Sequence, residues 1–189
     1  MNKLYLGISG KMGSGKTTLT NGLIGSLPHL KCDRVSLAAP IKNLQNIIYS
    51  ELDLEMVGEK DRELLIALGM WGRSKSDTLW LDQATKKMKL TESDIIICDD
   101  VRFPNEAKWF TENGLLLRLE GEQRGDNVDE SKKDDSSETA LDDFNFKYYI
   151  QNTEGIEATL MAALYSIAQH INVSEELVDD IREELTKEG

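Results

Sequence analysis

The apolar run Leu4-Tyr-Leu-Gly-Ile-Ser9 leads directly into Gly10-Lys-Met-Gly-Ser-Gly15-Lys16-Thr17, and a helical pattern of apolar residues follows over Lys16–Ser26. The middle stretch matches G-x-x-x-x-G-K-[ST], the spacing of a loop that cradles phosphates between a strand and a helix. Glycine permits the backbone angles with which successive N–H groups curl around a polyphosphate, and the helix N-terminus adds its dipole. The three parts together predict a nucleoside triphosphate site in an α/β fold.

Two kinds of side chain complete such a site. Lys16 is expected to reach the β- and γ-phosphates, and the hydroxyl of Thr17 is expected to ligate Mg²⁺. A carboxylate at the end of a neighbouring strand is the usual second metal ligand. The apolar run Ile95–Cys98 ends at Asp99 and Asp100, of which we favour Asp100 and place Asp99 second. The residues predicted to bind ATP are Gly10, Lys11, Met12, Gly13, Ser14, Gly15, Lys16, Thr17 and Thr18.

Apolar runs bounded by turn residues recur along the chain with helical patterns between them. This alternation predicts a three-layer α/β fold with a largely parallel sheet of about five strands. The run at Asp94–Cys98 is apolar throughout its middle, as expected for a central strand covered on both faces. The predicted strands are Leu4–Ser9, Arg34–Ala38, Asp94–Cys98, Leu115–Leu119 and Phe146–Gln151. The predicted helices are Lys16–Ser26, Ile41–Glu51, Asp61–Gly69, Asp77–Lys89, Pro104–Asn113 and Ile156–Ile171.

The composition excludes several classes of protein. With 34 acidic and 22 basic residues the formal charge is -12, and the excess lies in two stretches, 120–143 and 174–189. The rest of the chain has no basic stripe that could neutralise nucleic-acid phosphates, so we expect no nucleic-acid partner. No apolar run is long enough to span a bilayer, which argues against a membrane protein and for a cytoplasmic location. Cys32 and Cys98 have no motif spacing and are expected to be reduced thiols.

We expect a single domain over residues 1–189, with an acceptor-binding arm near 40–90. Residues 121–138 contain almost no apolar side chains, which indicates either a solvated loop or a mobile lid near 121–140. Residues 174–187 predict an acidic amphipathic helix whose apolar stripe packs either on the domain or in a homodimer contact. The stripe consists of Leu177, Ile181 and Leu185.

Four further motifs occur in order along the chain. They are Leu37-Ala-Ala39-Pro40-Ile-Lys42, Arg62-Glu-Leu-Leu-Ile-Ala-Leu-Gly69-Met-Trp-Gly72-Arg73 with Trp80 after it, Asp100-Val-Arg102-Phe-Pro-Asn105-Glu106 and Ser137-Glu138-Thr-Ala-Leu141. Taken together from about residue 4 to 153, the chain resembles the phage-type deoxynucleoside monophosphate kinases, which are P-loop enzymes of the nucleotide kinase group. The resemblance implies transfer of the γ-phosphoryl group of ATP, with Mg²⁺, to a deoxynucleoside 5′-monophosphate in deoxynucleotide biosynthesis.

Arginines gather in or beside these motifs, and guanidinium forks suit bidentate capture of a phosphate. The resemblance implies that Arg73 and Arg102 hold the monophosphate of the acceptor, with Arg62 as a weaker helper. Arg124 is expected to reach the donor phosphates from the lid. Asp100, the first residue of its motif, belongs to the predicted acceptor site as well. For each of these arginines the alternative is an ion pair at the surface.

The remaining candidate residues have two interpretations each. Trp71 and Trp80 are expected to line the base pocket, although bulky aromatic side chains at helical positions more often belong to a core. Lys42 is expected near the sugar or phosphate of the acceptor, or else on a solvated helix face. Arg34 and Arg118 are assigned to surface ion pairs.

Two other functions stay open at this point. Dephospho-coenzyme A kinase is a small-acceptor kinase whose fold and early motifs look similar, and base selectivity would separate the two activities. A P-loop module that senses nucleotide, with slow or absent hydrolysis, is the alternative outside the enzymes. The chain also departs from the family, because Asp135 stands where a histidine usually precedes the Ser-Glu pair and the insert is acidic. His29 and His170 lie outside every motif, so we propose no histidine acid-base chemistry.

Overall fold

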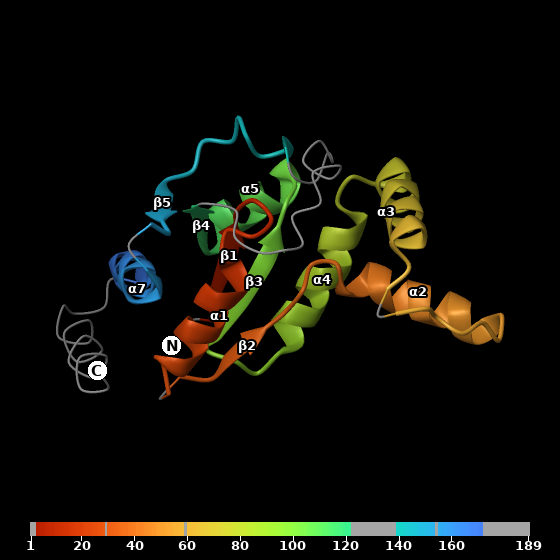
Figure 1. Cartoon of the computed structure of the whole chain (residues 1–189), viewed down its shortest axis with the longest axis horizontal. Helices are drawn as coiled ribbons and strands as arrows, with labels where there is room; N and C mark the ends of the chain where they lie inside the picture. The colour runs from red at the N-terminus through yellow and green to blue at the C-terminus, as the bar shows by residue number, and fades with distance from the viewer. Residues whose placement is uncertain (1–2, 29, 59, 122–138, 154, 172–189) are drawn as a thin grey trace. The chain divides into compact units, whose positions relative to one another are not determined.

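The computed structural model describes residues 3–28, 30–58, 60–121, 139–153 and 155–171 (Figure 1). The predicted lid arginine Arg124, most of the predicted lid and the predicted C-terminal helix lie outside these residues. The chain divides into two compact units, which are described separately. Unit 1 consists of Met1–Arg34 and Glu92–Gly189, and unit 2 consists of Val35–Thr91.

Unit 1 contains a five-stranded sheet in which every neighbouring pair of strands is parallel, in the order β2-β3-β1-β4-β5. The strands are β1 (Leu4–Ser9), β2 (Cys32–Arg34), β3 (Ile95–Val101), β4 (Leu115–Glu120) and β5 (Tyr148–Gln151). The predicted α/β fold with a parallel sheet is therefore confirmed. Because the strands are parallel, the phosphate-binding loop after β1 and the carboxylates near the end of β3 meet at the same edge of the sheet.

Helices cover both faces of this sheet (Figure 1). They are α1 (Lys16–Gly25), α5 (Pro104–Asn113) and α7 (Ile156–Ile171). Leu6 and Ile8 of β1 belong to the core that α1 and α7 cover. The intervening Gly7 faces α5, because a β-carbon there would stand 2.6 Å from the ring of Phe110. Successive side chains of a strand point to opposite faces, so α5 lies across the sheet from α1 and α7.

Unit 2 consists of three helices that pack against one another, namely α2 (Ala39–Glu51), α3 (Arg62–Lys75) and α4 (Leu79–Leu90). Asp61 begins α3 as its N-cap and accepts a hydrogen bond from the N–H of Leu64 at 3.0 Å. The same carboxylate accepts the hydroxyl of Tyr49 at 2.7 Å, and the Asp61 N–H donates to the Gln45 side chain at 3.0 Å. Both partners lie on α2, so the start of α3 is tied to that helix.

Three elements, namely β2, β3 and α3, end three or more residues away from the predicted end, and other boundaries differ by one or two residues. The second strand covers Cys32–Arg34 and not Arg34–Ala38, because only those three residues pair with β3. The chain then turns, with the Ala39 N–H donating to the Ser36 carbonyl, and Pro40 lies in the first turn of α2. The strand β3 continues through both aspartates because Val101 still pairs with Ser9 of β1.

The helix α3 passes its two glycines and runs on to Lys75, beyond the predicted end at Gly69. Cys32 and Cys98 are free thiols. Among the helices that the structure describes, none combines the length and the apolar character that crossing a membrane requires.

Candidate functional site

The loop between β1 and α1 depends on glycine at three positions. Gly13 and Gly15 have φ angles of 77° and 95°, in the left-handed region that other residues rarely adopt. At Gly10 a β-carbon would stand 2.6 Å from the carbonyl oxygen of Leu119. The backbone can therefore form a tight cradle that ends at the N-terminus of α1, where free N–H groups favour an anion.

Lys16 lies across this loop. Its ammonium donates to the carbonyl oxygens of Gly10 and Lys11, each at 2.7 Å. These contacts hold the positive charge at the mouth of the cradle, where an incoming phosphate oxygen can exchange for a loop carbonyl. Contact of Lys16 with the β- and γ-phosphates stays a prediction.

The two aspartates lie where the pairing of β3 with β1 shifts register, between Cys98 and Val101, and they have different neighbours. Asp99 is buried and accepts the guanidinium of Arg34, with Nε 2.9 Å from Oδ1 and Nη2 2.7 Å from Oδ2. The same Nη2 lies 3.4 Å from the hydroxyl oxygen of Thr17. The charge of Asp100 instead acts on Glu106 in the first turn of α5. The arrangement favours Asp99 over Asp100 as the partner of Thr17.

The donor set at Thr17 and Asp99 fits Mg²⁺. Both groups are hard oxygen donors, and a cationic nitrogen already lies in contact with the two. Within the part of the chain that the structure describes, no three His, Cys, Asp or Glu side chains are grouped as metal ligands. A hydroxyl and one carboxylate suit Mg²⁺, which completes its shell with water and substrate phosphates.

Arg34 forms an ion pair as predicted, but the surface assignment was wrong for Arg118. Arg118 is 8% exposed because β4 is an interior strand of the sheet. Its Nη1 donates to the Ser9 hydroxyl at 3.1 Å, and its guanidinium lies 5.3 Å from the ring centre of Phe146. Its Nη2 lies 3.7 Å from Asp142, which also pairs with Lys11 of the loop. These contacts support the base of the phosphate loop.

Asn152 is a site residue that the sequence analysis missed. Its amide donates to the Ser14 carbonyl at 2.9 Å, and its oxygen accepts the Thr159 hydroxyl at 3.2 Å. The amide nitrogen lies so near Gly15 that a β-carbon there would be 2.6 Å from it. The available signal in the sequence was an asparagine directly after a predicted strand, with a glycine, Gly155, before the next predicted helix.

Each of the two units contains a pocket. The pocket at the phosphate loop has a volume of about 590 Å³, and the pocket in unit 2 has a volume of about 370 Å³. The larger pocket is lined by Gly13, Gly15, Lys16, Thr17, Thr18, Asn152, Gly155 and Ile156. Polyphosphate-binding backbone at one end and an apolar side chain at the other suit a nucleotide.

The start of α5 holds a carboxylate with a perturbed pKa. Glu106 accepts hydrogen bonds from the backbone N–H groups of Arg102 and Phe103, at 2.8 and 3.0 Å. Burial raises the pKa of Glu106 to about 7, and the nearby Asp100 adds to the rise while the two N–H groups oppose it. Glu106 thus orders the backbone around Arg102, one of the predicted phosphate ligands.

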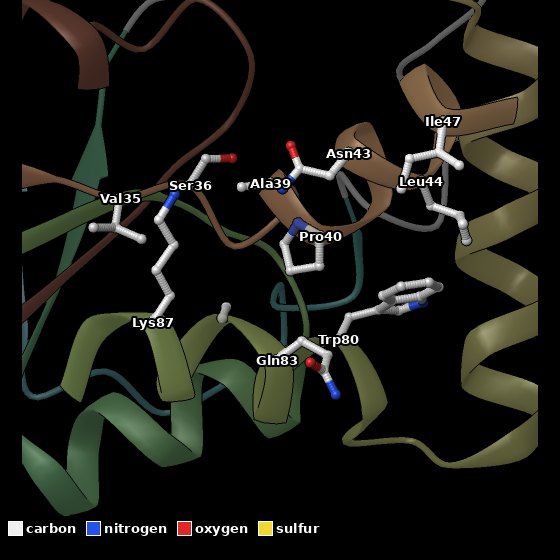
Figure 2. Close-up of a pocket in the computed structure, with 11 residues that line it drawn as sticks. Val35, Ser36, Ala39, Pro40, Asn43, Leu44, Ile47, Trp80, Gln83 and Lys87 are labelled. Atoms are coloured by element: carbon white, nitrogen blue, oxygen red, sulfur yellow. The ribbon is translucent and has the colours of Figure 1, made fainter. Parts of the chain in front are cut away.

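The smaller pocket, of about 370 Å³, lies within unit 2 between α2 and α4. Figure 2 shows Pro40 and Leu44 of α2 opposite Trp80 and Gln83 of α4, with Lys87 extending toward Ser36. An aromatic face, apolar walls and a few polar groups are the usual composition of a site for a flat organic ligand. The full lining is Val35, Ser36, Ala39, Pro40, Asn43, Leu44, Ile47, Trp80, Gln83, Ala84 and Lys87.

The structure separates the two tryptophans that the sequence grouped together. Trp80 lines the pocket, whereas the side chain of Trp71 on α3 is 52% exposed and outside the lining. Lys42 is exposed on α2 and also outside the lining, and Arg62 is exposed at the start of α3. Arg73 is half-buried and lies against Gly69. Asn43, Gln83 and Lys87 are pocket residues that no motif indicated.

Comparison with known proteins places these features in context. The family model of the phosphomevalonate kinases matches residues 8–115. No curated protein sequence is significantly similar to the chain. Shikimate kinase from Aquifex aeolicus vf5 superposes with a TM-score of 0.52 at 12% identity, over 90% of this chain and all (100%) of that chain. TT1252 from Thermus thermophilus superposes with a TM-score of 0.53 at 18% identity, over 92% of this chain and 100% of that chain. At these identities the likeness establishes the α/β fold of the P-loop kinases.

Proposed function

The chain belongs to the phosphomevalonate kinase family. We propose that it transfers the γ-phosphoryl group of ATP to the phosphate of a deoxynucleoside 5′-monophosphate. An oxygen of the acceptor phosphate attacks the γ-phosphorus, the bond to the β,γ-bridging oxygen breaks, and ADP and the deoxynucleoside diphosphate result. The acceptor oxygen is already ionised at neutral pH, so the reaction needs no general base. Positioning and cationic stabilisation carry such a transfer.

The donor half of the proposal is supported by the phosphate loop and its surroundings. The loop N–H groups and Lys16 would hold the β- and γ-phosphates, and Asn152 holds the loop in shape by its bond to the Ser14 carbonyl. Thr17 and Asp99 would hold Mg²⁺, which neutralises phosphate charge when it is bound. Arg102 and Arg73 are the proposed ligands of the acceptor phosphate, because their forks suit a phosphate monoester.

The observation that supports the proposed acceptor is the position of Trp80 in the lining of the smaller pocket. The pocket lining combines the Trp80 indole, which can stack on a planar ring, with the polar amides of Asn43 and Gln83. Nucleobases are planar, with donors and acceptors around the rim, so a base fits this lining better than an aliphatic chain does. We assign the pocket between α2 and α4 to the base of the acceptor.

A second candidate acceptor follows from the family itself, whose name points to phosphomevalonate. That compound is also a phosphate monoester, so the same donor half and the same arginines would serve. It has no planar ring, and therefore gains nothing from the indole face. The two acceptors can be separated by experiment.

The test is a coupled assay for ADP with ATP and Mg²⁺ and one acceptor at a time: each of the four deoxynucleoside monophosphates, phosphomevalonate and dephospho-coenzyme A. We expect turnover with at least one deoxynucleotide and a much lower kcat/KM with the other two compounds. A preference for phosphomevalonate or dephospho-coenzyme A would overturn the acceptor assignment and keep the donor half. No turnover with any acceptor would favour a nucleotide-sensing module.

A variant ties the activity to the proposed site. Lys16→Ala should abolish transfer while the far-ultraviolet circular dichroism spectrum stays unchanged. Lys108→Ala is the matched control, since this lysine is exposed on α5 and pairs only weakly with Glu112 at 3.8 Å. Retained activity in Lys16→Ala would show that the phosphates bind elsewhere.

A further inference from the structure

Arg34 occupies an unusual place in the sheet. It is the last residue of β2 and pairs with Ile97 of β3, so its side chain leaves the sheet at the edge that carries the phosphate loop. Its guanidinium forms an ion pair with Asp99: Nε donates to Oδ1 at 2.9 Å, and Nη2 lies 2.7 Å from Oδ2, a buried oxygen that accepts no hydrogen bond. No motif pointed to this residue.

One nitrogen of Arg34 contacts both groups that suit a metal ion. Nη2 is shared between Oδ2 of Asp99 and the hydroxyl oxygen of Thr17, at 2.7 and 3.4 Å. The Asp99 side chain is only 4% exposed, and a carboxylate this deeply buried needs a positive partner. The guanidinium supplies that partner in the nucleotide-free protein.

Arg34 is also able to leave. Its own side chain is 43% exposed, and β2 is a three-residue strand at the edge of the sheet. An arginine has a long flexible stem, so its guanidinium can move to solvent or to a phosphate without displacing the backbone. Asp99, by contrast, belongs to the interior strand β3 and stays where it is.

We propose that the Arg34 guanidinium and a divalent cation compete for the same oxygens of Asp99 and Thr17, so that Arg34 is a positioning residue that keeps the cation site closed until nucleotide arrives. The inference rests on the proposed function, because it takes Asp99 and Thr17 as the cation site. A cation without nucleotide must displace Arg34 and gains only two protein oxygens. With a bound triphosphate, the phosphate oxygens attract both the cation and the released guanidinium.

The experiment measures binding of Mn²⁺ alone, by loss of its free electron paramagnetic resonance signal, to the full chain and two variants. Arg34→Gln removes the competitor and should bind Mn²⁺ about tenfold more tightly than the original protein, as expected when a charge-assisted hydrogen bond no longer has to be broken. Lys31→Gln removes the same charge from an exposed residue just before β2 and should leave Mn²⁺ affinity unchanged. With a non-hydrolysable ATP analogue, the original protein and Arg34→Gln should differ much less.

Equal or weaker Mn²⁺ binding by Arg34→Gln would overturn the competition, provided that the original protein binds Mn²⁺ together with the ATP analogue. Absence of that ternary binding would overturn the proposed donor site itself, and the inference with it. Should Arg34→Gln fail to fold, nitrogen-15 spectra of the original protein decide the matter. The Nε–H signal of Arg34 should change on addition of Mg²⁺ and the analogue, and an unchanged signal would contradict the proposal.

Discussion

The indole ring of Trp80 lies against the α-carbon of Gly72, so closely that a β-carbon at Gly72 would stand 2.3 Å from the ring. The indole N–H also donates to the carbonyl oxygen of Gly69 at 3.2 Å. Two glycines one turn apart on α3 thus receive the side chain that lines the pocket between α2 and α4. The presence of Gly72 inside a helix, where glycine is unfavourable, is explained by this contact, whereas a β-carbon at Gly69 would meet the Arg73 guanidinium at 3.2 Å.

Gly72→Ala tests this packing. The added methyl group has no room beside the ring, so we expect the free energy of unfolding to fall by about 1–3 kcal/mol. Denaturant unfolding followed by circular dichroism measures the change. Gly25→Ala on α1 is the control, because a β-carbon there meets nothing within 4 Å, and it should leave stability unchanged or slightly raised. Equal stability of the two variants would mean that the ring does not rest on Gly72.

Trp80→Ala tests the assignment of the pocket. Stacking of a base on an aromatic ring contributes about 1–3 kcal/mol, so the KM of the deoxynucleotide should rise about tenfold or more. The KM of ATP should stay the same, because the donor pocket lies in the other unit. Steady-state kinetics with each substrate varied in turn measures both constants.

Leu90→Ala is the control for that substitution, since Leu90 ends the same helix and is 84% exposed. It should leave both KM values unchanged. If the KM of the acceptor is the same in Trp80→Ala as in Leu90→Ala, the base does not bind in this pocket.

Asn152→Ala tests the support of the phosphate loop. Loss of the bond to the Ser14 carbonyl leaves a loop carbonyl without its donor, so stability should fall by about 1–2 kcal/mol. ATP affinity, measured by calorimetry, should weaken severalfold because the loop is less well ordered. Gln151→Ala, at the exposed neighbouring position, should change neither quantity. If Asn152→Ala binds ATP as tightly as the original protein, Asn152 contributes to stability and not to ATP binding.

The raised pKa of Glu106 predicts a pH dependence of stability. Burial lifts the pKa from 4.5 to about 7, so between these values the folded protein binds more protons than the unfolded chain. The contribution of Glu106 to stability is therefore fully present below pH 4.5 and is lost as the pH rises through about 7. Glu106→Gln, which has no proton to lose, should flatten this part of the stability curve.

Chemical denaturation at a series of pH values measures that curve. Glu112→Gln, an exposed carboxylate on the same helix, is the matched control and should keep the slope of the original protein. If stability depends on pH with the same slope in Glu106→Gln as in Glu112→Gln, a group other than Glu106 is responsible for the pH dependence.

The phosphate loop and the parallel sheet could be predicted from the sequence because their determinants are local. Strand, glycine loop and helix follow one another between Leu4 and Gly25, and each is specified by its own residues. The apolar run of β3 likewise indicated an interior strand, although the middle strand of the sheet is β1 and not β3 as predicted. Such elements can be recognised from the sequence because the order of apolar, glycine and polar residues within a short stretch reflects its backbone geometry and burial.

Contacts between distant segments were decided only by the tertiary structure. Register between β2 and β3 brings Arg34 to Asp99, whereas the charge of Asp100 acts on Glu106 of α5. Packing of α3 on α4 selects Trp80 rather than Trp71 for the pocket. Each of these outcomes depends on which surfaces of separate elements meet, and no local pattern of residue types records that choice.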